Sequence, residues 1–373
     1  MNPRIVYWSV FLCLFIWSCS KDEAGEQEMV NEQNAARFQF IGEDEDSIYW
    51  YNYDSEQELL TSLNLTAEDN LDRFYITLRQ VDDVLSFFSL FQGNFSLFQK
   101  NIQNNSSSTT ENFISITGER SVIWGANTET QILVGYYSPP GSGEFGVRVL
   151  DIGTGDFVDT PLASNVFDTL EPLYFNQRLF ASYLDNNDRY HLVVFSTADF
   201  LIIRSFDFGD QIPAFLIDET GNLVLLRGRQ GVFSKEVYSL ENMDLLMSDP
   251  FQLNEFLEPG PLNAYLTGNK LYYQSALVQP APLSYTPAVY NFDNTENRVI
   301  DILTIRETVI EQIGQNFIPT SFGFDEKGRN FLMGFAKTIP NGTFNGGIII
   351  IAEDGTLIET LELPVAPTYF IKN

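Results

Sequence analysis

Residues 149–158 read VLDIGTGDFV, two short apolar runs separated by a turn rich in Asp, Gly and Thr. This order predicts a β-hairpin, because Asp, Asn and Gly accept the backbone angles of tight turns. The pattern recurs as YNYDSEQELL at 51–60, VFSTADFL at 194–201, VYSLENMDLL at 237–246, VYNFDNTENRV at 289–299 and IIAEDGTLI at 350–358, with an irregular copy around 95–110. The chain is therefore expected to consist of repeated hairpins.

The hairpins recur about every 50 residues. Reference positions in the seven copies are spaced by 45, 53, 45, 43, 52 and 61 residues; they are Asn52, Leu97, Leu150, Phe195, Tyr238, Tyr290 and Ile351. A second series of turns follows the same period, at 127, 176–177, 218–222, 268–269 and 325–328. Two hairpins, hence four short strands, in a period of about 40 to 50 residues are typical of a β-propeller blade.

We therefore predict an all-β fold, a β-propeller of seven four-stranded blades, with six blades as the alternative because the second unit is irregular. The first unit, from Arg37, is short by one strand, and residues 367–371 form a spare strand at the other end of the chain. Pairing this spare strand with the first unit would close the ring and protect its edges. Apolar residues at helical spacing also predict one short helix at 303–315, before the last blade.

The charge balance excludes one broad class of partner. The chain has 50 acidic and 21 basic residues, a net charge of −29. Nucleic-acid binding is excluded because affinity for phosphates depends on Lys and Arg, and a basic patch for anionic lipid is not expected either. The two cysteines, Cys13 and Cys19, both lie near the N-terminus. The body is therefore expected to hold no disulfide, cysteine zinc site or thiol nucleophile.

The first 18 residues resemble a signal peptide. Arg4 precedes an uncharged apolar run at 5–17, which is too short to span a bilayer core of about 30 Å. Cys19 at the end of this region resembles the lipobox cysteine of bacterial lipoproteins. That resemblance implies that residues 1–18 are cleaved and that the Cys19 thiol is acylated. An ordinary secretory signal and an uncleaved membrane anchor are the alternatives.

The residues after Cys19 point to a location. Lys21, Asp22 and Glu23 resemble the surface-export signal of Bacteroidota lipoproteins. The resemblance implies an outer-membrane protein, held only by its N-terminal lipid and facing the cell exterior, with the periplasmic face as the alternative. Residues 19–36 are polar and acidic and are expected to be a disordered tether. Residues 37–373 are then a single propeller domain.

No catalytic constellation stands out in the sequence. His191 is the one histidine, and we expect a half-buried strand residue with a hydrogen-bond partner. Residues 43–46 and 185–188 carry carboxylates that could bind structural calcium, but turns are the favoured interpretation. No metal site or other cofactor is expected. The aromatic residues at 49–51 and 136–137 could offer rings to a sugar, although we expect them in the core.

The period and the turn chemistry resemble bacterial propellers with TolB-like, NHL-like or YncE-like blades. We expect a non-enzymatic binding or scaffold protein, whose rigid ring presents loops to an outer-membrane protein or to a surface glycan. The alternative is a carbohydrate-active hydrolase or lyase that uses carboxylates in the propeller funnel. Such an enzyme needs two acidic side chains roughly 5–10 Å apart in one pocket.

The anchor assignment makes a direct prediction. Replacing Cys19 with alanine should release the protein from the membrane fraction and leave the body folded, because the tether adds nothing to the core. Fractionation of cells that express the Cys19→Ala variant, followed by a thermal melt of the released protein, checks both points. Continued membrane association of the variant would overturn the lipoprotein assignment.

Overall fold

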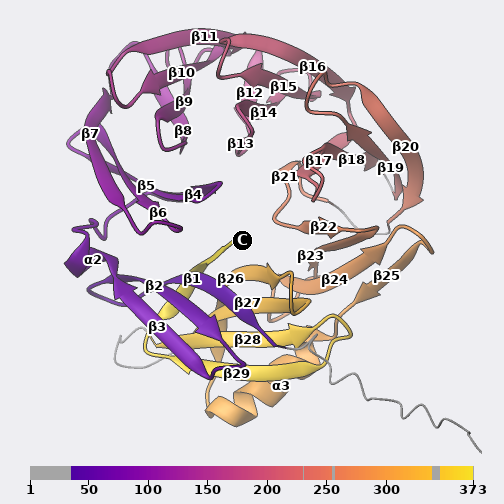
Figure 1. Cartoon of the computed structure of the whole chain (residues 1–373). Helices are drawn as coiled ribbons and strands as arrows, with labels where there is room; N and C mark the ends of the chain where they lie inside the picture. Colours follow the sequence, from indigo (N-terminus) through magenta and orange to yellow (C-terminus); the bar gives the residue numbers. More distant parts are fainter. Residues whose placement is uncertain (1–34, 230, 254–256, 338–344, 373) are drawn as a thin grey trace, which may run out of the picture.

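The described part of the protein forms a ring of seven β-sheets (Figure 1). The structure is a computed structural model, and it describes residues 35–372 except 230, 254–256 and 338–344. Each sheet is one blade, and the blades are numbered here from the N-terminus. The four main strands of each blade are counted outwards from the ring axis, and the additional short strands are left out of this count. The prediction of seven four-stranded blades is confirmed, with additional short strands in the fourth and fifth.

The first three blades have four strands each. Blade 1 consists of β30 (Ala366–Ile371), β1 (Arg37–Glu43), β2 (Ile48–Asp54) and β3 (Leu59–Asn64). Blade 2 consists of β4 (Thr77–Val81), β5 (Val84–Phe91), β6 (Asn94–Asn101) and β7 (Ser107–Ser115). Blade 3 consists of β8 (Ser121–Asn127), β9 (Gln131–Tyr137), β10 (Phe145–Asp151) and β11 (Phe157–Ala163).

Blades 4 to 7 complete the ring. Blade 4 has β12 (Val166–Thr169) and β13 (Leu173–Phe175), both paired with β14 (Arg178–Asp185), then β15 (Tyr190–Ser196) and β16 (Leu201–Gly209). Blade 5 has β17 (Ile212–Ile217), β18 (Leu223–Arg229), β19 (Val232–Tyr238) and β20 (Leu245–Gln252), with β21 (Gly260–Pro261) parallel to β17. Blade 6 has β22 (Tyr265–Thr267), β23 (Lys270–Ala276), β24 (Tyr285–Asn291) and β25 (Glu296–Val299). Blade 7 has β26 (Phe317–Asp325), β27 (Asn330–Lys337), β28 (Gly346–Ala352) and β29 (Leu357–Leu363).

Both series of sequence repeats have a fixed place in the blade. All seven reference positions lie on the third strand of their blade, and the second series of turns lies where the first strand meets the second. Because neighbouring strands are antiparallel, the turns between strands 1 and 2 and between strands 3 and 4 emerge on one side of the ring, here called the turn face. The turns between strands 2 and 3 emerge on the other side, here called the opposite face.

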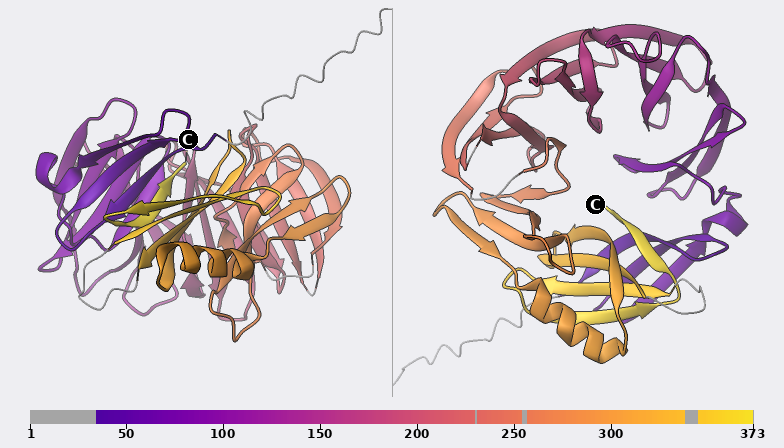
Figure 2. Two further views of the ribbon diagram at one scale, coloured as in Figure 1. Left: turned by 90° about the horizontal axis from the view of Figure 1, so that it is seen from below. Right: turned by 180° about the vertical axis from the view of Figure 1, so that it is seen from behind.

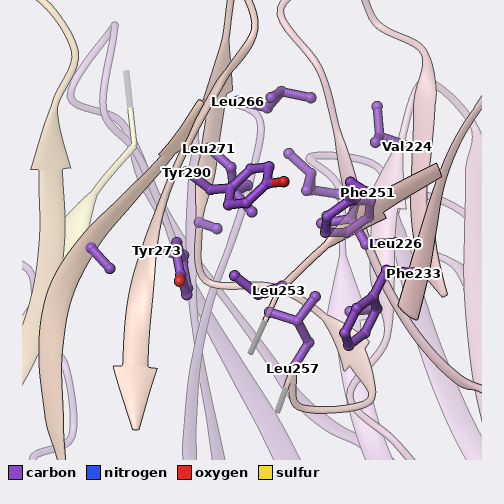
Figure 3. Packing of buried hydrophobic residues seen from close by; sticks show 14 of the residues in the cluster. Val224, Leu226, Phe233, Phe251, Leu253, Leu257, Leu266, Leu271, Tyr273 and Tyr290 are labelled. Carbon is purple, nitrogen blue, oxygen red and sulfur yellow. The ribbon is translucent and has the colours of Figure 1, made fainter. Parts of the chain in front are cut away.

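Apolar side chains fill the space between neighbouring blades. The described residues form seven buried hydrophobic clusters, one for each pair of adjacent blades. Figure 3 shows the cluster between blades 5 and 6, where Phe233 and Phe251 of blade 5 face Tyr290 of blade 6. Each blade therefore buries both of its faces only because it has a neighbour on each side.

The predicted closure strand is confirmed. β30 pairs antiparallel with β1, with Phe370 opposite Phe40 and Ile371 opposite Gln39. The Phe370 ring also contacts Phe38 with centroids 5.9 Å apart. A Cβ atom at Gly323 of blade 7 would lie 2.5 Å from the Cβ of Phe370, so only glycine allows this close approach. The first and last segments of the chain therefore share one sheet.

Two boundaries differ slightly from expectation. The helix expected at 303–315 is α3 (Ile302–Ile313), which lies on the outside of the ring beside blade 7 (Figures 1 and 2) and buries Ile305 and Val309. Ala36, the last residue of the expected tether, is 1% exposed and donates its N–H to Ser55. A short helix, α2 (Leu65–Glu68), follows blade 1. Neither described helix is long and apolar enough to cross a membrane.

Closure through β30 makes Phe370 a sensitive position. Replacing Phe370, which is 5% exposed, with alanine should lower the free energy of unfolding by about 3–5 kcal/mol, because the lost ring leaves a cavity between blade 1 and blade 7. Replacing Val278, which is 91% exposed, with alanine is the control and should change it by less than about 0.5 kcal/mol. Denaturant unfolding measures both variants. Equal stability of the two would contradict the closure role of β30.

Candidate binding site on the turn face

The sequence-predicted anchor lies outside the described residues. Cys19, Lys21, Asp22 and Glu23 all precede residue 35, the first residue that the structure describes. The chain enters the body at the turn face, where the Arg37 N–H donates to a carboxylate oxygen of Asp325 at 3.2 Å. The lipid anchor and the export signal therefore stay predictions.

A cavity of about 740 Å³ opens on the turn face, over blades 2, 3 and 4. It is formed by turns, because the turn residues of three adjacent blades surround it. Its polar side chains are three carboxylates, six amides and four hydroxyls: Asp82, Asp83 and Glu129; Asn101, Gln103, Asn104, Gln131, Asn176 and Gln177; Thr128, Thr130, Tyr174 and Thr197. No lysine or arginine is among the described residues that line it.

Hydrogen bonds fix the turns around this cavity. The Asn101 Oδ1 accepts N–H groups of Gln103 at 2.9 Å and Asn104 at 3.0 Å. The Thr128 Oγ1 likewise accepts the N–H of Thr130 at 3.2 Å and of Gln131 at 3.1 Å. Such local bonds are the usual way in which Asn and Thr shape turns. The cavity is therefore lined by turns whose backbone is held in place before any ligand binds.

The carboxylates of the cavity influence one another. Burial, and then the neighbouring charge of Asp83, raise the pKa of Asp82 above its usual 3.8. Burial also raises the pKa of Tyr174, whose hydroxyl lies 3.2 Å from the Thr197 Oγ1, and the charge of Asp82 adds to this effect. Asp82 of blade 2 and Tyr174 of blade 4 therefore line the same cavity from two blades.

More charges lie near the ring axis. The Gln80 side chain donates to the Lys372 carbonyl at 2.6 Å and accepts the Lys372 N–H at 2.8 Å, so the end of β30 is held at the centre of the ring (Figure 1). Desolvation lowers the pKa of Lys372, and the charge of Glu326 opposes this effect. Burial, then the charges of Glu219 and Asp325, raise the pKa of Glu326. The turn face is therefore strongly acidic near its centre.

The two acidic runs singled out from the sequence are turns. The Asp185 Oδ1 accepts N–H groups of Asn187 at 2.8 Å and Arg189 at 3.0 Å between β14 and β15. Burial opposes ionisation of Asp185, but these donors outweigh it and lower its pKa to about 2. The Asp44 Oδ1 similarly accepts the N–H of Ser47 at 2.7 Å. Among described residues, no group of three or more His, Cys, Asp or Glu is placed to hold a metal ion.

The other residues singled out from the sequence lie on strands. His191 lies on β15, half-buried, with its Nε2 3.4 Å from Asp185 and its ring stacked on Tyr183. Trp50, Tyr51 and Tyr136 are less than 9% exposed and belong to the core, whereas Tyr49 and Tyr137 are half-buried. The sequence pattern does not predict the turn-face cavity. Its turns at 127 and 176–177 belong to the second series of repeated turns. That series does not indicate that turns of three different blades line one cavity.

Comparisons with known proteins agree on the fold. No protein-family model and no curated protein matches this chain. A putative 6-phosphogluconolactonase from Bacteroides uniformis is similar over 90% of this chain and 100% of its own, with 13% identity and a TM-score of 0.50. A Dos1 propeller is similar over 83% of this chain and 74% of its own, with 13% identity and a TM-score of 0.42.

A structure from a study of two prolyl endopeptidases is similar over 78% of this chain, with 10% identity and a TM-score of 0.47. This chain spans 43% of that protein's length. Of these likenesses, the one to the lactonase, with a TM-score of 0.50 and 13% identity, supports the fold alone, a β-propeller, and transfers no activity.

Neutralising Asp82 should stabilise the protein at neutral pH. A carboxylate whose pKa is raised in the folded state destabilises the fold as pH increases from the unfolded value of 3.8 through the raised one. Asp82→Asn removes this effect, and asparagine accepts the φ of 49° at this position. The melting temperature of the variant should exceed the wild type at pH 7 but not at pH 3. Asp188→Asn, another turn position with a φ of 57°, is the control; an equal rise there would contradict the prediction.

Proposed function

We propose that the protein is a surface lipoprotein that binds a neutral glycan in the turn-face cavity without converting it. The single observation that carries the proposal is the lining of this 740 Å³ cavity, which combines amides, hydroxyls and carboxylates with no basic side chain among its described residues. Cavities of roughly 300–1,000 Å³ suit small ligands. The predicted lipid at Cys19 and the export signal at Lys21, Asp22 and Glu23 would place this cavity at the cell exterior.

The chemistry of the lining favours sugars over other ligands. A sugar hydroxyl both donates and accepts hydrogen bonds, carboxylates accept them, and amide side chains such as Gln103 and Gln131 do both. An anionic glycan is disfavoured because the net charge is −29 and the cavity itself holds three carboxylates. Burying a polar ligand is favourable only where such partners satisfy its hydrogen bonds.

The arrangement of the carboxylates favours binding over hydrolysis. Asp82 and Asp83 are consecutive residues of one turn, and Glu129 contacts the side-chain amide of Asn101. A glycosidase needs an acid and a second carboxylate on either side of the scissile bond. One observation favours the alternative of a hydrolase or lyase: the raised pKa of Asp82 is a property of general acids. Product analysis separates the two proposals.

The glycan proposal predicts a specific loss of binding. The mature chain with Cys19→Ala is screened against neutral and anionic polysaccharides, and affinity is measured for those that bind. Combining Gln103→Ala with Thr130→Ala, two exposed side chains of the cavity, should weaken neutral-glycan binding at least about tenfold, because hydrogen-bond partners of the ligand are lost. Asn187→Ala on the opposite face is the matched control and should leave affinity unchanged.

Two outcomes would contradict the proposal. Binding of no neutral glycan, or equal binding by the double variant, would remove the cavity as a glycan site. Shortened or unsaturated products in the mass spectrum of the bound glycan would replace the binding protein by a carbohydrate-active enzyme. In that case Asp82→Asn should abolish product formation, because the proton donor would be lost.

A further inference from the structure

A second, smaller cavity lies on the opposite face, between blades 2 and 3. Its volume is about 140 Å³, and four of its described lining residues are aromatic: Phe88, Phe95, Phe113 and Trp124. Gly125 contributes to the opening, because a Cβ atom there would lie 2.7 Å from a Phe88 ring carbon and push that ring aside. Cavities of about 150 Å³ with apolar walls stay dry and accept a benzene-sized ring.

One basic residue, Arg79 on β4, stands at this cavity. Its side chain is 16% exposed, and its guanidinium pairs with the carboxylate of Glu171 from the segment before β13. The Arg79 Nε is buried and has no hydrogen-bond partner among the described residues. A buried donor without a partner is unusual in a folded protein. Arg79 therefore has an unused N–H beside an aromatic cavity.

Glu171 is a replaceable partner. Its side chain is 69% exposed, whereas Arg79 is held on an inner strand. A carboxylate that approached from the cavity could engage both the Nε and an Nη of Arg79, which is the preferred two-point geometry for this pair. Glu171 would then turn out into solvent, where its charge is well hydrated. Ile76 lines the cavity and is 59% exposed, so the entrance is apolar as well.

We propose that this cavity binds a small aromatic carboxylate, with its ring among Phe88, Phe95, Phe113 and Trp124 and its carboxylate on Arg79 in place of Glu171. The site is independent of the proposed glycan cavity, which lies on the other face of the ring. The cavity volume, the unpaired Nε of Arg79 and the exposed carboxylate of Glu171 each point to the same ligand chemistry. Local contact with Arg79 has to overcome the overall negative charge, so binding should strengthen when salt screens that charge.

The test compares phenylacetate with its uncharged counterpart phenylacetamide by calorimetry on the mature Cys19→Ala chain. The wild-type body should bind phenylacetate at least about tenfold more tightly, since only the carboxylate can form the charged pair. Arg79→Met should remove this preference, and Glu171→Gln should increase phenylacetate affinity several-fold. Val122→Phe, which adds a ring to the cavity wall, should abolish binding of both compounds.

Arg178→Met is the matched control, because Arg178 also carries a buried Nε without a partner but lies on blade 4, away from this cavity. Its phenylacetate affinity should equal that of the wild type. The proposal fails if the wild type does not distinguish the two compounds, or if Glu171→Gln leaves phenylacetate affinity unchanged. Glu171 is exposed, so its variant should fold and keeps the test valid even if Arg79→Met is unstable.

Discussion

The ladder between β1 and β30 is the constraint on which the rest of this structure depends. It brings residues 39–43 next to 366–371 and so joins the two ends of the chain in one blade. Without it, blade 1 would present an unpaired inner edge, and the cluster between blades 1 and 7 would lose Phe370. Every other interface in the ring is formed by blades that are consecutive in sequence. The remaining six clusters can therefore form locally, but only this ladder fixes the ring as a closed object.

A closed ring explains how turns can form a binding site. Turns of a single hairpin are too short to enclose a ligand, but three adjacent blades hold their turns at fixed distances around the 740 Å³ cavity. On this face, burial and neighbouring charges raise the pKa values of Asp82 and Glu326. The ionised forms of these two side chains therefore destabilise the folded protein. Charges retained in this way are frequent at functional sites. The opposite face instead presents apolar side chains and the small cavity beside Arg79.

The sequence predicted the architecture well because repetition multiplies a weak local signal. A single stretch such as 149–158 indicates a hairpin, but seven copies at one period indicate blades, and all seven reference positions lie on third strands. The spare strand at 367–371 was predictable because a propeller has to close. His191 was predicted as a structural strand residue, and its stacking on Tyr183 agrees with that.

The two cavities were not predictable for a physical reason. Asp82 and Tyr174 line the first cavity, and Arg79 pairs with Glu171 beside the second, although the residues of each pair are about 90 positions apart in the chain. Such pairings depend on how neighbouring blades twist against one another, and no local pattern in the sequence records that. Gly125 is similar, because its role depends on the Phe88 ring of another blade.

The central claim is that closure between β1 and β30 holds the ring as one cooperative unit. Native-state hydrogen exchange of the backbone amides in this ladder, followed as denaturant is added, tests it most directly. The claim predicts that these amides exchange only through global unfolding, with the same free energy and denaturant dependence as amides in the central strands of blades 4 and 5. Exchange of the ladder by a separate opening of much lower free energy would show that the ring is stable without it, and would contradict the claim.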